Sequence, residues 1–265
     1  IIEVRGEECL IQVYEETSGL VPGEKVTNTK KPLSVTLGPG ILGGVFDGTQ
    51  RPLKVIKEQS GTFITRGVNV NQLDTNKVWN FKALVKSGDE VKPGQIIGEV
   101  EENPLITHKI LVPPKVSGKI KNIESGEFTI TEVIANIGDC EIKLAQEWAV
   151  RKPRPITKRA YSTKPLIAGQ RTLDFMFPIA KGGVGAIPGP FGSGKTVTQQ
   201  QFAKWCDAEI IVFIGCGERG IEMTEVLEEF PELKDPKSGH PLMNRTILIA
   251  NTSNMPVAAR EASVY

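Results

Sequence analysis

The pattern G-x-x-x-x-G-K-[ST], which cradles nucleotide phosphates, is matched at every position by eight consecutive residues: Gly189, Pro190, Phe191, Gly192, Ser193, Gly194, Lys195 and Thr196. Glycines in such a loop allow consecutive backbone N–H groups to turn toward phosphate oxygens. We expect Lys195 to place its charge on the β- and γ-phosphates and the Thr196 hydroxyl to ligate Mg²⁺. The sequence therefore predicts a site for ATP or ADP with Mg²⁺ that extends to Val197. The alternative is a Gly- and Pro-rich turn that carries Gly-Lys-Thr by chance.

A second group of charged residues follows the next apolar run of the chain. Glu218 and Arg219 stand between glycines in residues 215–220. In-line attack of water on a γ-phosphate uses a carboxylate to orient the water and a guanidinium to stabilise the phosphoryl oxygens. We therefore expect Glu218 and Arg219 to be catalytic; a surface ion pair or a helix cap is the alternative. Glu222, one helical turn further, is expected to reach the Mg²⁺ shell through a water, and a helix dipole explains it equally well.

Alternating strands and helices around these two motifs predict a parallel sheet. Three short apolar runs, 184–187, 210–214 and 246–250, suit strands that are buried on both faces. A helix is expected over 197–206, directly after the phosphate loop. A second helix carries apolar residues at helical spacing: Met223, Val226, Leu227 and Phe230. Parallel strands joined by helices place a ligand site at their carboxyl ends, where both motifs lie.

Changes in the pattern of apolar, polar and glycine residues divide the chain into four parts. Residues 1–34 read as short strands of a truncated β-barrel, and the glycine-rich residues 35–66 as a connector that packs on the nucleotide domain. Residues 67–150 form a β-rich insert, and residues 151–265 form the nucleotide-binding domain. The strands of the insert resemble biotinyl or lipoyl carrier domains. However, Lys109 lies inside an apolar run and not at a hairpin tip, so a structural insert is favoured.

Composition narrows the possible functions. The chain has 265 residues, 39% of them hydrophobic, and a net charge of +1, which gives no electrostatic reason to expect nucleic acid as a ligand. Its apolar runs are shorter than the roughly 20 residues that a membrane span needs. No C-x-x-C pair or zinc spacing exists, so the cysteines are interpreted as reduced, mostly buried thiols of a cytosolic protein: Cys9, Cys140, Cys206 and Cys216.

Five segments act together as a specific signature: "GQR" at 169–171, "IPGPFGSGKTVTQ" at 187–199, "GCGERG" at 215–220, "MTEVLEEFPEL" at 223–233 and "NTSNMPVAAREAS" at 251–263. Their combination resembles the catalytic A subunits of V-type and archaeal A-type rotary ATPases, and the resemblance covers essentially the whole chain. It implies a multidomain fold: an N-terminal β-barrel, a β-rich bulge insert, and a RecA-like P-loop domain with an incomplete parallel sheet.

The same resemblance implies an activity and partners. Lys195 and Thr196 would bind triphosphate and Mg²⁺, Glu218 would be the catalytic carboxylate, and Arg219 would contact the γ-phosphate. The implied activity is hydrolysis or synthesis of ATP, coupled to rotation and to translocation of protons or sodium ions. The implied partners are B subunits in an alternating hexamer, which supply an arginine finger, the central and peripheral stalks, and indirectly a membrane sector, with no nucleic acid. The location would be cytoplasmic and peripheral to a membrane.

Two departures from the family pattern limit these expectations. Ile221 stands where the family usually has Asn, and none of the three predicted strands ends in the aspartate that a Walker-B motif supplies. We interpret the chain as truncated at both ends, and expect it to be inactive by itself. Another RecA-like hexameric motor, such as a Rho-type helicase or a secretion ATPase, and a non-catalytic nucleotide-binding fragment are the alternatives.

Overall fold

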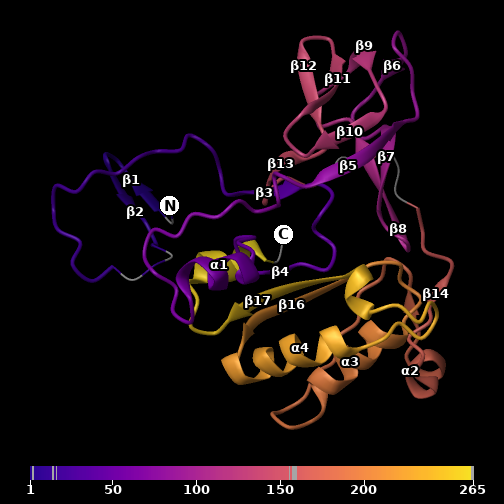
Figure 1. The fold of residues 1–265 in the computed structure, drawn as a ribbon. Helices are drawn as coiled ribbons and strands as arrows, with labels where there is room; N and C mark the ends of the chain where they lie inside the picture. Colours follow the sequence, from indigo (N-terminus) through magenta and orange to yellow (C-terminus); the bar gives the residue numbers. More distant parts are fainter. Residues whose placement is uncertain (2, 14, 16, 155, 157–159, 264–265) are drawn as a thin grey trace.

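The structure is a computed structural model that describes every residue except 2, 14, 16, 155, 157–159 and 264–265. The insert lies above the nucleotide-binding part, and the N-terminal strands lie to one side (Figure 1). None of the helices in the described part of the chain has the length and apolar character needed to cross a membrane.

The N-terminal segment forms one small hairpin. Strands β1 (Glu3–Arg5) and β2 (Glu8–Leu10) pair antiparallel, and all six of their residues are exposed. Gly6 turns the chain between them with a φ of 60°, a left-handed conformation that glycine adopts without steric cost. Short strands were expected within residues 1–34, and the hairpin agrees with that expectation; Ile2 and Tyr14 lie outside the described residues.

The insert consists of two four-stranded antiparallel sheets. One contains, in spatial order, β10 (Gly126–Thr129), β5 (Val78–Ala83), β7 (Ile96–Asn103) and β8 (Ile106–Leu111). The other contains, in spatial order, β12 (Cys140–Lys143), β11 (Val133–Ile137), β9 (Gly118–Ile123) and β6 (Glu90–Val91). Alternate residues along β5 point inward, so that Trp79 and Phe81 are buried while their neighbours are exposed. Lys109 lies within β8 opposite Glu99, as a structural insert requires and a carrier domain does not.

A pair of strands joins the start of the connector to the end of the insert. β3 (Ser34–Leu37) pairs antiparallel with β13 (Gln146–Ala149). A side-chain contact adds a second link between the insert and the nucleotide-binding part, because Nδ2 of Asn103 donates a hydrogen bond of 2.7 Å to the carbonyl oxygen of Asn244. The insert is therefore held at its base by strands and at its β7–β8 hairpin by a polar contact.

A three-stranded parallel sheet forms the centre of the nucleotide-binding part. Its order is β16 (Ile211–Glu218), β17 (Thr246–Thr252) and β4 (Val45–Phe46). The first two strands confirm the expected runs at 210–214 and 246–250. The third was not predicted: residues 45–46 of the glycine-rich connector join the sheet by pairing with Leu248 and Ile249.

Helices cover one face of this sheet. α3 (Lys195–Trp205) and α4 (Gly220–Glu232) lie side by side along β16 and β17 (Figure 1). α4 buries Met223, Val226 and Phe230, which confirms its predicted apolar face. Short elements complete this part: α1 (Leu53–Ser60), β14 (Pro165–Leu166), α2 (Arg171–Met176), β15 (Ile179–Ala180), η1 (Leu242–Arg245) and α5 (Val257–Ala262).

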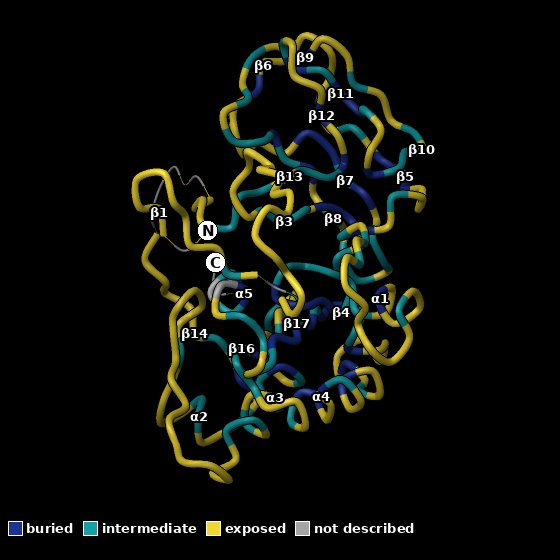
Figure 2. Tube along the Cα trace, turned by 90° about the vertical axis from the view of Figure 1, so that its left-hand side faces the viewer, coloured by how far each residue is buried: buried dark blue, intermediate teal, exposed yellow. Residues whose placement is uncertain are grey.

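Two sequence-based expectations about this sheet are wrong. Residues 184–187 form no strand: the whole segment 181–190 is exposed, and none of the described backbone hydrogen bonds involves residues 184–187. β16 is buried on one face only. Its other face, with Val212 at 52% and Ile214 at 39% exposure, opens into a cleft of about 1280 Å³ between the sheet and the insert. Figure 2 shows the exposed segments of the chain in yellow.

The cysteines also differ from expectation. Cys206 is the one buried thiol of the described chain, whereas Cys9, Cys140 and Cys216 are exposed. Cys9 and Cys140 lie on the outward positions of short strands, and Cys216 lies near the carboxyl end of β16, where the sheet is least covered. A cysteine in a strand with an uncovered face can be exposed, so the residue type alone did not predict which thiols are buried.

Candidate nucleotide-binding site

The phosphate loop leads directly into the amino terminus of α3. Gly194 precedes the helix with a φ of 82°, and Gly192 has a φ of 77°. Both values lie in the left-handed region that side chains strongly disfavour, so glycine at these two positions is a requirement of the backbone path. Lys195 and Thr196 are consequently the first two residues of the helix, whose free N–H groups and dipole favour an anion.

Side chains of the loop fold back onto its own backbone. The ammonium group of Lys195 donates hydrogen bonds of 2.7 Å each to the carbonyl oxygens of Gly189 and Pro190. The hydroxyl of Ser193 donates to the same Pro190 carbonyl at 2.8 Å. A Cβ atom at Gly189 would collide with the Ser193 side chain. The loop is thus a closed turn with the charge of Lys195 held at its centre.

Two threonines in the first turn of α3 differ in what their hydroxyls do. Thr198 donates from Oγ1 to the carbonyl of Gly194 at 2.9 Å, a bond within the helix. Among the described contacts the hydroxyl of Thr196 has no partner, so its oxygen is available to a cation. Val197 points outward and is 59% exposed. A hydroxyl oxygen at this place is a ligand of the type that Mg²⁺ accepts.

Glu218, Arg219 and Glu222 gather at the carboxyl end of β16. Glu218 is the last residue of the strand, and Arg219 is the residue before α4. Arg219 does not pair with Glu218; its Nε lies 3.9 Å from Oε1 of Glu222. Arg219 also makes no side-chain cap on the helix that follows it. The cap interpretation therefore fails for Arg219, and its ion pair runs to Glu222.

The phosphate loop and the end of β16 meet in space. Burial raises the pKa of Glu218, its hydrogen bond to Glu222 and the negative charge of Glu222 raise it further, and the positive charge of Lys195 lowers it. Glu218 therefore lies within the field of both groups. The guanidinium carbon of Arg219 lies 4.4 Å from the ring centroid of Phe191, so a second contact joins the two motifs. The structure brings the predicted site residues together.

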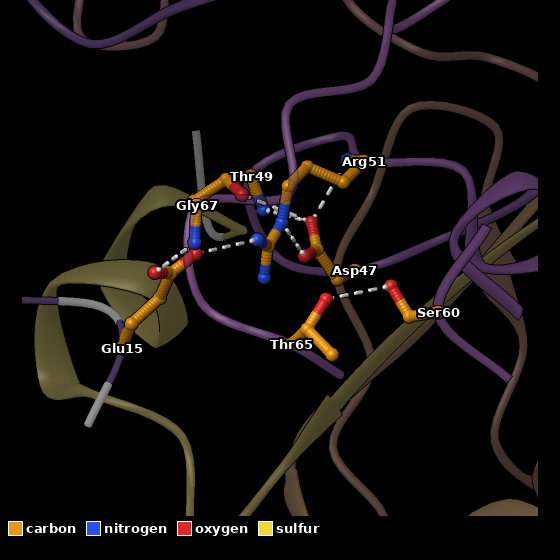
Figure 3. A network of polar contacts seen from close by, with 7 residues as sticks. All are labelled: Glu15, Asp47, Thr49, Arg51, Ser60, Thr65 and Gly67. Atoms are coloured by element: carbon orange, nitrogen blue, oxygen red, sulfur yellow. Dashed lines mark hydrogen bonds and ion pairs between the residues drawn. The ribbon is translucent and has the colours of Figure 1, made fainter. Parts of the chain in front are cut away.

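Sequence reasoning missed a buried acid at the same sheet edge. Asp47 follows β4, and its side chain is 1% exposed. Its Oδ1 accepts hydrogen bonds from the backbone N–H groups of Thr49 at 2.9 Å and Arg51 at 2.8 Å, and its Oδ2 lies 2.7 Å from Nε of Arg51 (Figure 3). A short apolar run that ends in Asp with Arg four residues later was the signal for it.

The network around Asp47 is structural. Arg51 extends from Asp47 to Glu15, with 3.7 Å between Nη1 and Oε1, and Glu15 accepts a hydrogen bond of 2.9 Å from the N–H of Gly67 (Figure 3). These contacts tie the N-terminal segment and the connector to the sheet. Because Asp47 already accepts several donors, it does not fill the place of the missing Walker-B aspartate.

Comparisons with known proteins assign most of the chain to one family. Residues 169–265 match the nucleotide-binding domain of the ATP synthase alpha/beta family, residues 70–151 the barrel-sandwich domain of ATP synthase alpha/beta subunits, and residues 1–30 the beta-barrel domain of the same family. The A subunit of an A-type ATP synthase from Methanospirillum hungatei is 62% identical over all of this chain, and a V-type ATP synthase alpha chain of Thermoanaerobacter is 60% identical.

The chain spans 46% of the length of each of these relatives. One similar solved structure is the assembled ATPase EscN in complex with its central stalk EscO, from the type III secretion system of enteropathogenic E. coli. Its sequence is 17% identical to this chain, and the TM-score is 0.47. The match covers 94% of this chain and 40% of that chain. The three family domains together cover more than half of the sequence, in the expected order of barrel, β insert and nucleotide-binding domain. The chain therefore belongs to the ATP synthase alpha/beta family, and its relatives are the A subunits of A-type and V-type enzymes.

Proposed function

We propose that this chain is part of the catalytic subunit of an A-type or V-type rotary ATPase that hydrolyses or synthesises ATP. One observation carries the proposal. Lys195 of an intact phosphate loop lies close enough to Glu218, at one end of the sheet, for its positive charge to lower the pKa of that carboxyl group. Relatives that are named ATP synthase subunits and are about 60% identical support it.

Each side chain has a distinct task in the proposed reaction. Lys195 exchanges its carbonyl partners for oxygens of the β- and γ-phosphates, and the N–H groups at the start of α3 bind the same anion. Glu218 accepts a hydrogen bond from the attacking water and orients it in line with the bond that breaks. Arg219 stabilises the charge that spreads over the phosphoryl oxygens.

The proposed cofactor is Mg²⁺, with the Thr196 hydroxyl as its ligand from the loop. A bound Mg²⁺ neutralises charge on the β- and γ-phosphates. We also propose that Glu222 reaches the Mg²⁺ shell through a water; in the structure its Oε1 lies 3.9 Å from Nε of Arg219. The remaining ligands, including a Walker-B aspartate, would come from other parts of the full-length subunit.

The proposed assembly follows from the names of the relatives as ATP synthase subunits. We propose an alternating hexamer with B subunits, which supply an arginine finger, together with a central and a peripheral stalk and a membrane sector that moves protons or sodium ions. In this arrangement the subunit is cytoplasmic and reaches the membrane only through the complex.

The test is Lys195→Ala in the full-length subunit, assembled with its partners. We expect ATP turnover to be lost, because the ammonium of Lys195 is the one charge within the loop. Lys204→Ala, at the other end of the same helix, is the matched control and should retain turnover. Unchanged turnover in Lys195→Ala would remove the assignment. Steady hydrolysis by the 265-residue chain alone would show that the residues proposed to come from outside it are not needed.

A further inference from the structure

One acidic residue joins the end of the phosphate-loop helix to a segment that lies 40 positions earlier in the chain. Asp207 follows the last residue of α3, Trp205, by two positions. Its backbone N–H donates a hydrogen bond of 3.0 Å to the carbonyl oxygen of Ile167, and its Oδ1 accepts a hydrogen bond of 3.1 Å from the N–H of the same residue. These two bonds hold the chain after β14 against the end of α3.

The other carboxylate oxygen of Asp207 contacts the strand that leads toward the phosphate loop. Its Oδ2 lies 2.6 Å from Nζ of Lys181, the residue directly after β15. The hydrogen bond from Lys181 holds the pKa of Asp207 below its usual range, so this carboxylate is charged at neutral pH. β14 and β15 pair with each other, and Asp207 contacts the residue that follows each of them.

A close approach of the backbone adds a second contact with the end of α3. Gly169 has a φ of 79°, and a Cβ atom at this position would lie 2.5 Å from the Cβ of Trp205. The carboxylate of Asp174 in α2 accepts hydrogen bonds from the N–H groups of Ala168 at 2.7 Å and Gly169 at 3.1 Å. The segment between β14 and α2 is therefore held on both sides, by α2 and by the end of α3.

The segment that enters the phosphate loop has few other contacts. Residues 181–190 are exposed, and none of the described backbone hydrogen bonds involves residues 184–187. At the far end of the segment, the ammonium of Lys195 binds the carbonyl oxygens of Gly189 and Pro190. The ion pair between Lys181 and Asp207 thus closes a unit that starts with this segment, contains the phosphate loop, and finishes at the end of α3.

We propose that Asp207 is a positioning residue for the phosphate loop, which rests on the proposed ATPase function: through Lys181 and Ile167 it fixes both ends of the unit that carries the loop. Asp207 does not touch the nucleotide, because α3, a helix of 11 residues and about 16 Å, separates it from the loop.

The expected consequence is a change in affinity. Without Asp207 the empty loop samples more conformations, and nucleotide binding must then supply the free energy that orders it. Bound phosphates hold the loop through Lys195 and the N–H groups at the start of α3. The effect should therefore fall on the dissociation constant, and much less on the reaction step of the bound complex.

The test uses the full-length subunit in its assembled complex, with MgADP as the probe of affinity. Asp207→Asn retains an oxygen for the N–H of Ile167 and loses the charge that binds Lys181, so the dissociation constant should rise by about threefold to tenfold. Asp207→Ala loses both contacts and should raise it further. In both variants kcat at saturating ATP should change by less than about twofold. Glu209→Ala, at an exposed acid two positions further along, is the matched control.

A double-mutant cycle tests whether Asp207 acts through Lys181. Lys181→Met should raise the dissociation constant as much as Asp207→Asn does, and the double variant should bind MgADP no more weakly than either single variant. Hydrogen exchange in β17 should stay unchanged in all three.

Three results would overturn the proposal: additive losses in the double variant, an Asp207→Ala variant that binds MgADP as tightly as Glu209→Ala, or a fall in kcat without a change in affinity. Faster exchange in β17 would overturn it too, because a general loss of structure would then explain the weaker binding. If Lys195→Ala in the same complex remained active, the proposed function itself would fail, and the two failures are therefore distinguishable.

Discussion

The β insert and the nucleotide-binding sheet bury their strands differently. The insert encloses side chains between two antiparallel sheets, and Phe81, Val91 and Ile97 are fully buried there. The parallel sheet has its two long helices, α3 and α4, on one face (Figure 1), while Val212 and Ile214 stay accessible on the other. All the proposed catalytic side chains lie on the less covered of these two regions. The proposed catalytic residues therefore lie in the nucleotide-binding sheet, which is less enclosed, and not in the insert, whose core is closed.

The largest expected contrast is in amide hydrogen exchange of this chain. Ladder amides of β7 and β11 should exchange only on unfolding of the insert, whereas residues 184–187 should exchange within seconds, because they are exposed and make none of the described backbone hydrogen bonds. β17 should fall between them, since it is paired on both sides. Mass spectrometry of exchanged peptides measures all three. Equal protection of residues 184–187 and β7 would contradict the comparison.

A second contrast comes from two buried phenylalanines, one in each region. Phe81→Ala should lower the free energy of unfolding of the insert by about 3–5 kcal/mol, because Phe81 is fully buried and packs edge-on against Phe128. Phe230→Ala in α4 should cost a similar amount, since Phe230 is equally buried and packs 5.2 Å from the ring of Phe213 in β16.

The two variants should differ in function. Only Phe230→Ala should weaken ATP binding in the full-length subunit, because Phe230 fixes α4 on β16 near Glu218. Phe63→Ala, at a side chain that is 83% exposed, is the control and should change stability by less than about 0.5 kcal/mol. Denaturant titration with hydrogen exchange measures stability, and calorimetry measures affinity. Weaker ATP binding in Phe81→Ala would mean that the two regions are tightly coupled.

The smallest expected effect lies at the contact between the insert and the connector. Burial of Glu102 opposes its ionisation, but hydrogen bonds from His108 and from the backbone N–H groups of Gly40 and Leu42 outweigh burial, so the pKa of Glu102 is lowered. A lowered pKa stabilises the fold above the ordinary carboxyl value of about 4.3, and this stability is lost as the pH falls below it.

Glu102→Gln should therefore reduce stability at pH 7 by about 1–2 kcal/mol and have little effect at low pH, where Glu102 is already protonated. Glu101→Gln, at the exposed neighbour in the same strand, is the control. Thermal melts between acidic and neutral pH measure both variants. A loss that is the same at every pH would show that the hydrogen bonds matter and the charge does not.

Local sequence determined much of the site. The phosphate loop needed glycine at positions 192 and 194, where the backbone is left-handed, and the same pattern predicted that a helix follows. The periodic apolar residues of α4 predicted its buried face, because a helix of this length must place residues three and four apart on one side. These features depend on neighbours in sequence, so the amino-acid sequence alone is enough to predict them.

Only the tertiary structure decided which partners these elements have. Residues 184–187 have the composition of a strand, yet a strand needs a paired neighbour, and sequence composition does not supply one. Residues 45–46 joined the sheet through pairing with β17, some 200 positions along the chain. Motifs and periodicity can be read from neighbouring residues, whereas strand pairing depends on distant parts of the chain that meet only in the fold.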